Sequence, residues 1–295
     1  MEQTTAKKNK YEIDMCNGTI MDKLISFSLP LMLSGILQLM FNAVDIIVVG
    51  RFSGSQALAA VGSTSALINV FTNLFIGISL GANVLTARFY AAGREKEVSE
   101  TVHTAITLAL VSGIVMALVG LVFSKGALAL MGTPDDVIGL SALYMRIYFL
   151  GMPFFMLYNY GAAILRAVGD TKRPLFFLVI SGMTNAVLNL VLVIVFHMGV
   201  AGVAIGTIVS QLISSILVLR CLYTSNTSYR LYFSKLGIKT QYLKQIFQVG
   251  IPAGIQSTVI NLSNALLQSS VNSFGSVAMA GYTAANNIFG FLYMS

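Results

Sequence analysis

Long apolar runs separated by short polar breaks dominate the chain. Each run has roughly 20 residues or more, the length that an α-helix needs to cross a bilayer. We predict membrane-spanning helices at residues 24–50, 57–86, 101–123, 137–165, 174–197, 200–223 and 246–273. A further apolar run begins near residue 277. The pattern predicts an all-α polytopic membrane protein.

The composition supports this prediction. Hydrophobic residues make up 56% of the chain and charged residues 10%, with a mean hydropathy of +0.80. An ordinary soluble domain is about 25% charged, so lipid must solvate most of this chain. We therefore expect the lipid bilayer to be its main environment.

The 18 basic residues predict the orientation, because short loops rich in Lys and Arg stay in the cytoplasm. Most of them lie in the N-terminal tail and in alternate loops: Lys7, Lys8, Lys10, Lys23, Arg88, Arg94, Lys96, Arg166, Lys172, Arg173, Arg220, Arg230, Lys235, Lys239 and Lys244. We expect a multi-pass protein of the cell membrane with a cytoplasmic N-terminus. This loop bias explains the net charge of +7, so we expect no nucleic-acid partner.

The first and seventh apolar runs resemble each other. Leu29-Pro30 corresponds to Ile251-Pro252, and Phe52 corresponds to Phe274 at the same offset. An even number of helices between the copies predicts two halves related by an axis along the membrane normal. The predicted organisation is a cytoplasmic tail (1–23), a six-helix lobe (24–223), a cytoplasmic inter-lobe loop (224–245) and the beginning of a second lobe (246–295). We expect about four further helices to complete that lobe.

Asp45 is the only one of the 11 acidic residues that lies within an apolar run. A charged group at the bilayer centre costs at least about 2.5–3.5 kcal/mol, and it usually faces a cavity on an ion or substrate pathway. Gln38 and Asn42 share its helical face with Ser34, so we expect them to line the same cavity. We interpret the polar stripe of the seventh helix as interhelical hydrogen bonding: Ser257, Asn261, Asn264 and Gln268.

Three segments carry a family resemblance. They are the run Pro30 to Gly50 with Val44-Asp45 and Val49-Gly50, the segment Leu165-Arg166-Ala167-Val168-Gly169-Asp170-Thr171-Lys172-Arg173-Pro174, and Gly199-Val200-Ala201-Gly202-Val203-Ala204-Ile205-Gly206-Thr207. In order and spacing they resemble the multidrug and toxic compound extrusion (MATE) family. The resemblance implies twelve helices in two six-helix lobes, and a cation-coupled antiporter that exports drugs and other toxic organic compounds.

The resemblance also implies a cation-coupling site. The first-helix carboxylate, here Asp45, would take Na⁺ or H⁺, and the helix would bend at Pro30. The other family positions map onto Asn185, Asn189 and Thr207. Several family members carry a second aspartate where this chain has Asn189. Na⁺ accepts carboxylate, amide and hydroxyl oxygens, so these four residues could still hold one ion.

Gln211 lies one helical turn beyond Thr207 and would add a polar side chain to the same cavity. Burial would let the carboxylate take up a proton, whereas a bound Na⁺ or cationic drug would favour its charged form. Proton, sodium ion and drug would then compete for one negative charge. We expect small organic cations as substrates, no cofactor beyond Na⁺ or H⁺ as coupling ion, and a monomer when complete.

Three alternatives remain open. A lipid-linked oligosaccharide flippase of the same superfamily would need a more cationic cavity for its phosphates. A membrane-embedded enzyme would need paired carboxylates, a His/Glu metal motif or a nucleophile with a base, and the sequence shows none, so we expect no enzyme. A non-transporting fragment or structural subunit is the third alternative.

Overall fold

The computed structural model describes residue 13 and residues 19–130 and 135–272. The apolar run predicted near residue 277 and almost all of the N-terminal tail lie outside these ranges. Within them the chain is helical, with no strand.

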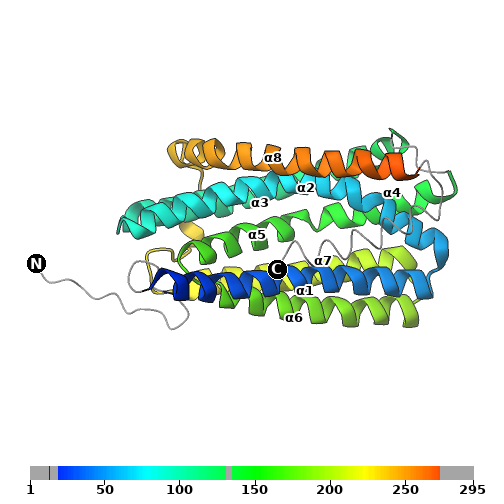
Figure 1. Ribbon diagram of the computed structural model, residues 1–295, viewed down its shortest axis with the longest axis horizontal. Helices are drawn as coiled ribbons and strands as arrows, with labels where there is room; N and C mark the ends of the chain where they lie inside the picture. Colours follow the sequence, from blue (N-terminus) through cyan, green and yellow to red (C-terminus); the bar gives the residue numbers. More distant parts are fainter. Residues whose placement is uncertain (1–12, 14–18, 131–134, 273–295) are drawn as a thin grey trace, which may run out of the picture.

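Eight α-helices follow one another along the chain: α1 (Ile20–Phe52), α2 (Gly54–Ala91), α3 (Glu95–Leu130), α4 (Asp135–Leu150), α5 (Met152–Ala167), α6 (Lys172–Leu190), α7 (Gly199–Thr224) and α8 (Thr240–Asn272). A π-helical turn, Val191–Val195, extends α6, and a short 3₁₀ turn, Phe233–Lys235, lies between α7 and α8. The helices run roughly side by side in an elongated bundle, with α2, α3 and α8 on one side and α1, α6 and α7 on the other (Figure 1).

Among the described residues, five helices are long and apolar enough to span a membrane: α1, α2, α3, α6 with its π turn, and α7. The pair α4 and α5 meets the same criterion together, with a bend of 49° between the two helices. The helix α8 covers the seventh predicted span, but it is more polar and is not among these five. The prediction of an all-α multi-pass membrane protein is confirmed.

The span predicted over residues 137–165 consists of two helices, α4 and α5, rather than one continuous helix. The chain breaks at Gly151, between α4 and α5. Pro153 explains the break, because proline has no backbone N–H and its ring clashes with the carbonyl four residues earlier. Gly113 of α3 provides the space, since a Cβ at that position would overlap the backbone of Pro153.

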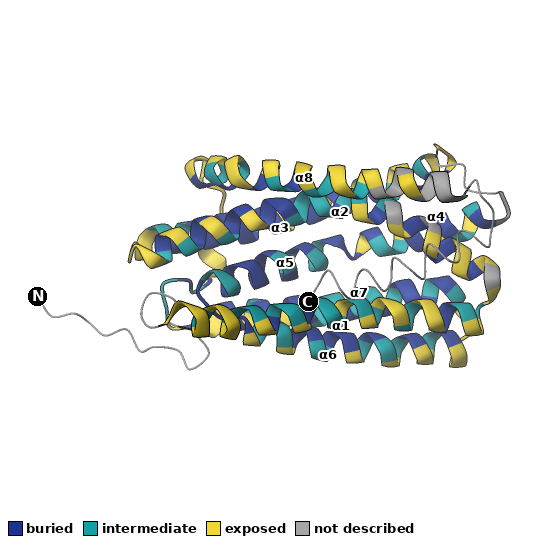
Figure 2. Cartoon of the chain, viewed as in Figure 1, coloured by how far each residue is buried: buried dark blue, intermediate teal, exposed yellow. Residues whose placement is uncertain are grey.

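The helix α5 runs through the middle of the bundle and contacts α2, α3 and α7. Its second half is almost entirely buried, whereas exposed side chains follow the outer faces of α6 and α8 (Figure 2). Many of the exposed side chains are large and apolar, among them Leu118, Val122 and Phe123 of α3. Such surfaces are expected where the solvent is lipid.

The helix α8 packs most extensively against α2. Gly77 of α2 faces Gly254 of α8 and Gly81 faces Gly250, and a Cβ at Gly77 would overlap the backbone of Gly254. A Cβ at Gly250 would lie 2.6 Å from the Cα of Ile78. Both helices thus carry a G-x-x-x-G pattern, which lets two membrane helices approach closely. This contact holds the first helix of the second predicted repeat against the first lobe.

The connection between α7 and α8 packs against α3 and is shorter than the predicted loop of residues 224–245. Tyr229 and Leu231 are fully buried, and the backbone N–H of Tyr232 donates to His103 Nε2 at 3.0 Å. Lys239 Nζ lies 2.5 Å from Glu100 Oε1. This connection lies at the same end of the bundle as the basic α2–α3 and α5–α6 loops (Figure 1).

Candidate cation site

A cavity of about 360 Å³ lies between α1, α2, α4, α5, α6 and α7. Its polar lining includes Gln38, Asn42, Asp45, Asn69, Asn73, Tyr144, Tyr148, Asn159, Asn185, Thr207 and Gln211. Asp45 is the one charged residue among the described residues of this lining. A cavity with apolar walls and a single negative charge favours cations over anions.

A chain of side-chain hydrogen bonds starts at Asp45. Asn189 Nδ2 donates to Asp45 Oδ1 at 2.5 Å and to Asn185 Oδ1 at 3.3 Å. Asn185 Nδ2 in turn donates to Thr207 Oγ1 at 3.4 Å. The structure therefore brings the four residues predicted for cation coupling together, from α1, α6 and α7.

The amide of Asn189 presents nitrogen, not oxygen, to the carboxylate. Its Oδ1 is buried and has no hydrogen-bond partner among the described residues. That oxygen lies against Gly206 of α7, where a Cβ would overlap it. Asn189 could bind a cation beside Asp45 through oxygen only after its amide rotates by half a turn, which the absent side chain of Gly206 makes easier.

The other predicted cavity residues also reach the site. Gln38 and Asn42 line the cavity from α1, and Gln211 lines it from α7. The Oε1 of Gln211 is buried without a hydrogen-bond partner in the described part of the chain. An unpaired buried oxygen is costly, and a cation or a substrate N–H would satisfy it.

Pro30 is buried inside α1, which continues without interruption on both sides of it. Ser34 Oγ donates to the carbonyl of Pro30 at 2.8 Å. A proline removes one backbone hydrogen bond, and a serine bonded four residues back weakens the helix further. Bending at Pro30 stays a prediction, and these two features mark the place where α1 would bend most easily.

Several lining residues were not predicted. Asn69 and Asn73 lie one turn apart on α2, Asn159 lies on α5, and Tyr144 and Tyr148 lie one turn apart on α4. The helical spacing of Asn69 and Asn73 was a usable signal, because two amides on one face of an apolar helix seldom face lipid. The aromatic rings offer surfaces for organic cations.

The fold and this cavity define a polytopic α-helical membrane protein with an acidic interior cavity. The MatE family model matches residues 30–191, which is more than half of the chain. The chain therefore belongs to the MatE family.

Two curated relatives come from Bacillus subtilis (strain 168). The chain is 35% identical over 277 residues to the "Probable multidrug resistance protein YoeA", and the match covers 91% of this chain and 59% of the relative. It is 29% identical to the "Probable multidrug resistance protein YpnP", covering 93% and 61%. The chain thus spans about three-fifths of the length of these relatives.

The fold matches that of a solved MATE family transporter of the MOP superfamily in an outward-facing conformation. The TM-score is 0.89 at 23% sequence identity, and the match covers 98% of this chain and 64% of the other. This likeness places α8 within the shared fold, since it extends over nearly the whole chain.

Proposed function

We propose that this protein is a secondary active transporter that exports cationic or amphiphilic organic compounds in exchange for Na⁺ or H⁺. The observation that carries the proposal is Asp45, the one charged side chain in the described lining of the cavity. The names of the Bacillus relatives, which refer to multidrug resistance, agree with export as the direction of transport.

The proposed mechanism is competition for one negative charge. Proton, sodium ion and organic cation each neutralise Asp45, so binding of one displaces another. Asn185 and Thr207 offer oxygens to Na⁺, and Asn189 would add one after rotation of its amide. Inward movement of the ion supplies about 2.3 kcal/mol per charge for each 100 mV of membrane potential, in addition to its concentration gradient.

The proposal also includes the orientation and assembly. The basic end of the bundle would face the cytoplasm, in agreement with the positive-inside rule. A second lobe, with about four helices beyond those of this chain, would complete the fold as a parallel repeat. The complete transporter would act as a monomer.

Efflux of a fluorescent organic cation from membrane vesicles tests this function. Vesicles carrying the intact gene product receive an imposed Na⁺ gradient or an imposed H⁺ gradient, each against a matched vesicle without the protein. We expect efflux under one gradient and not under the other, which identifies the coupling ion. Equal dye loss from both kinds of vesicle would contradict the proposal.

A flippase for lipid-linked oligosaccharides is the second candidate of the same superfamily. Phosphate groups need Arg or Lys partners, and the described residues lining this cavity include neither. We therefore favour a cationic substrate. Competition of the dye by polyprenyl phosphates, but not by organic cations, would reverse this preference.

We expect that Gly206→Ala weakens ion-driven efflux by about tenfold, comparable to the loss of an outer-shell partner of a metal ligand. The new methyl group would overlap Asn189 Oδ1 and fill the space in which the amide rotates, so Asn189 could not turn its oxygen toward a cation beside Asp45. The initial rate of dye efflux at several Na⁺ concentrations measures the effect.

Gly126→Ala is the matched control for this variant, because a Cβ at Gly126 of α3 has no atom within 4 Å. It should retain the efflux rate of the unmodified protein. A Gly206→Ala protein with the ion dependence of this control would show that the position of the Asn189 amide does not matter for coupling.

A further inference from the structure

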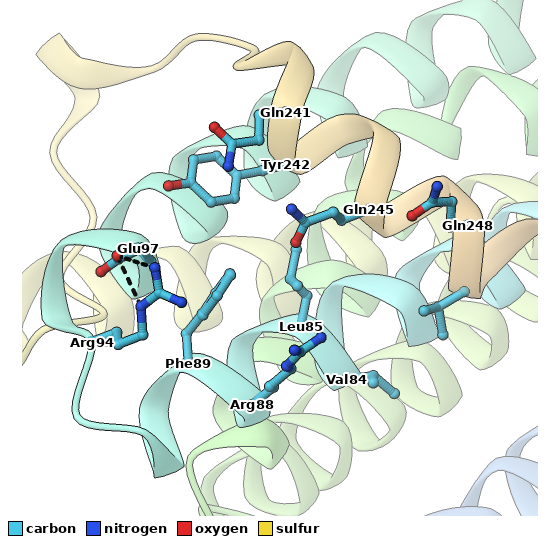
Figure 3. A pocket seen from close by; sticks show the side chains of 11 residues that line it. Val84, Leu85, Arg88, Phe89, Arg94, Glu97, Gln241, Tyr242, Gln245 and Gln248 are labelled. Atoms are coloured by element: carbon cyan, nitrogen blue, oxygen red, sulfur yellow. Dashed lines mark hydrogen bonds and ion pairs between the residues drawn. The ribbon is translucent and has the colours of Figure 1, made fainter.

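A second pocket lies outside the candidate cation site, at the basic end of the bundle (Figure 3). It has a volume of about 370 Å³ and lies between the end of α2, the beginning of α3 and the beginning of α8. Arg88 projects from α2 toward α8, and Gln245 and Gln248 line the α8 side of the pocket (Figure 3). The remaining lining residues are Val84, Leu85, Phe89, Arg94, Glu97, Gln241, Tyr242 and Val249.

The two arginines of this pocket differ in whether an acidic side chain neutralises them. Arg94 donates to Glu97 Oε1 from Nε at 2.9 Å and from Nη2 at 2.6 Å, and its guanidinium lies 5.1 Å from the centre of the Phe89 ring. The guanidinium of Arg88, which also lines the pocket, has no hydrogen bond or ion pair with any described residue. The pocket therefore has one cation that is already neutralised and a second, Arg88, that is available to an anion.

The polar side chains around Arg88 suit a phosphate group. A guanidinium binds two phosphate oxygens at once in a planar, forked arrangement. Gln245 and Gln248 add amide groups that can donate to further oxygens or accept from hydroxyl groups of a headgroup. An inorganic cation is disfavoured, because Glu97 is the one acidic residue in the described lining and it is paired with Arg94.

The apolar side chains of the pocket extend toward the middle of the bundle. Val84 lies one helical turn before Arg88, and Val84 and Val249 are 43% and 39% exposed. One further turn inward, Gly81 of α2 meets the backbone of α8 at Ile246 and Gly250 and closes the space between the helices. The pocket is thus cationic at the end of the bundle and apolar where the helices enter the hydrocarbon layer.

We propose that this pocket binds an anionic phospholipid, with its phosphate on Arg88 and the start of its acyl chain along Val84 and Val249. Such a lipid would contact α2 of the first lobe and α8 of the second predicted repeat together. The site depends on neither export nor the coupling ion, so a failure of the proposed function leaves it untouched.

Binding of short-chain lipids to the full chain in detergent micelles tests the site. The probes are dioctanoyl phosphatidylglycerol, dioctanoyl phosphatidylcholine and glycerol 1-phosphate, and bound lipid is counted by native mass spectrometry. We expect phosphatidylglycerol to bind more tightly than the other two. Arg88→Gln should weaken its binding about fivefold, the usual effect of one basic residue near an anionic lipid.

Arg220→Gln is the matched control, because Arg220 is an exposed arginine at the same end of the bundle, on α7. It should bind phosphatidylglycerol as the unmodified chain does. Gln245→Ala alters the α8 wall of the pocket without changing its charge, and it should also weaken binding. A monodisperse elution profile and an unchanged helical circular dichroism spectrum establish that each variant is folded.

Three results would overturn the proposal. Equal losses of phosphatidylglycerol binding in Arg88→Gln and Arg220→Gln would show that the lipid is attracted to surface charge in general. Equal binding of phosphatidylcholine would show that the site does not select an anion. Equal binding of glycerol 1-phosphate would assign the pocket to a soluble phosphate compound and not to a lipid.

Discussion

Asp45→Asn should reduce gradient-driven efflux to the level of vesicles without the transporter, while the protein still reaches the membrane. The substitution keeps the size of the side chain, and its oxygen can still accept the hydrogen bond from Asn189 Nδ2. It removes the one charge in the described lining of the cavity. Without that charge, proton, sodium ion and organic cation no longer compete for a shared site, so the ion gradient cannot drive export.

Asp22→Asn is the control for this variant. Asp22 lies in the first turn of the same helix, where it accepts a hydrogen bond from Thr19 Oγ1. Its replacement by asparagine removes an equal charge far from the cavity. This control should export the dye at the rate of the unmodified protein, whichever of the two gradients is imposed. If Asp45→Asn instead exports as fast as Asp22→Asn, the coupling ion must bind elsewhere, and the carboxylate has a structural role.

The positions of the helices could be predicted from hydrophobicity alone. The length needed to cross a bilayer fixes where a span can begin and end, and each predicted span falls on a described helix or, for residues 137–165, on two. The helices extend into the flanking polar segments, because backbone hydrogen bonding continues there without apolar side chains. At the start of α3, Glu95 and Glu97 favour this extension through the helix dipole.

Hydrophobicity alone could not predict the break at Gly151. An apolar run gives no sign of a bend, and prolines also occur inside straight membrane helices. In α1 the helix continues through Pro30, whereas the chain breaks just before Pro153. The difference depends on neighbours, since Gly113 of α3 leaves room for the displaced backbone at Pro153.

The candidate site was predicted only in part. The apolar context marked Asp45, and the family resemblance supplied Asn185, Asn189 and Thr207. Neither source could give the orientation of the Asn189 amide, because it depends on the absent side chain of Gly206 on a neighbouring helix. Periodicity shows which residues share a face of one helix, but not which helix that face meets.

The contact between α2 and α8 could not be predicted from the sequence either. The repeat predicted a second lobe beginning near residue 246, and this division stays a prediction. The packing of α8 on α2 depends on two pairs of glycines that are far apart in the chain. Their spacing is visible in each helix separately, but only the fold shows that Gly77 and Gly81 face Gly254 and Gly250.

Gly77→Val should separate α8 from α2. The valine side chain has no space, because even a Cβ at this position overlaps the Cα of Gly254. Overpacking of a tight contact typically costs about 1–3 kcal/mol, and here the obstacle is backbone, which cannot rotate away. We expect a lower midpoint of thermal unfolding in detergent and faster proteolysis of the connection at residues 225–239, which α8 helps to hold against α3.

Gly62→Val is the control for the general effect of placing a valine in α2. Gly62 lies on the same helix, and a Cβ there has no atom within 4 Å. Both variants replace a helical glycine by the same β-branched residue, so they share the change in helix propensity. Only Gly77→Val should expose the connection to protease. Equal unfolding midpoints and equal cleavage rates in the two variants would mean that α8 does not depend on this glycine contact to stay on the first lobe.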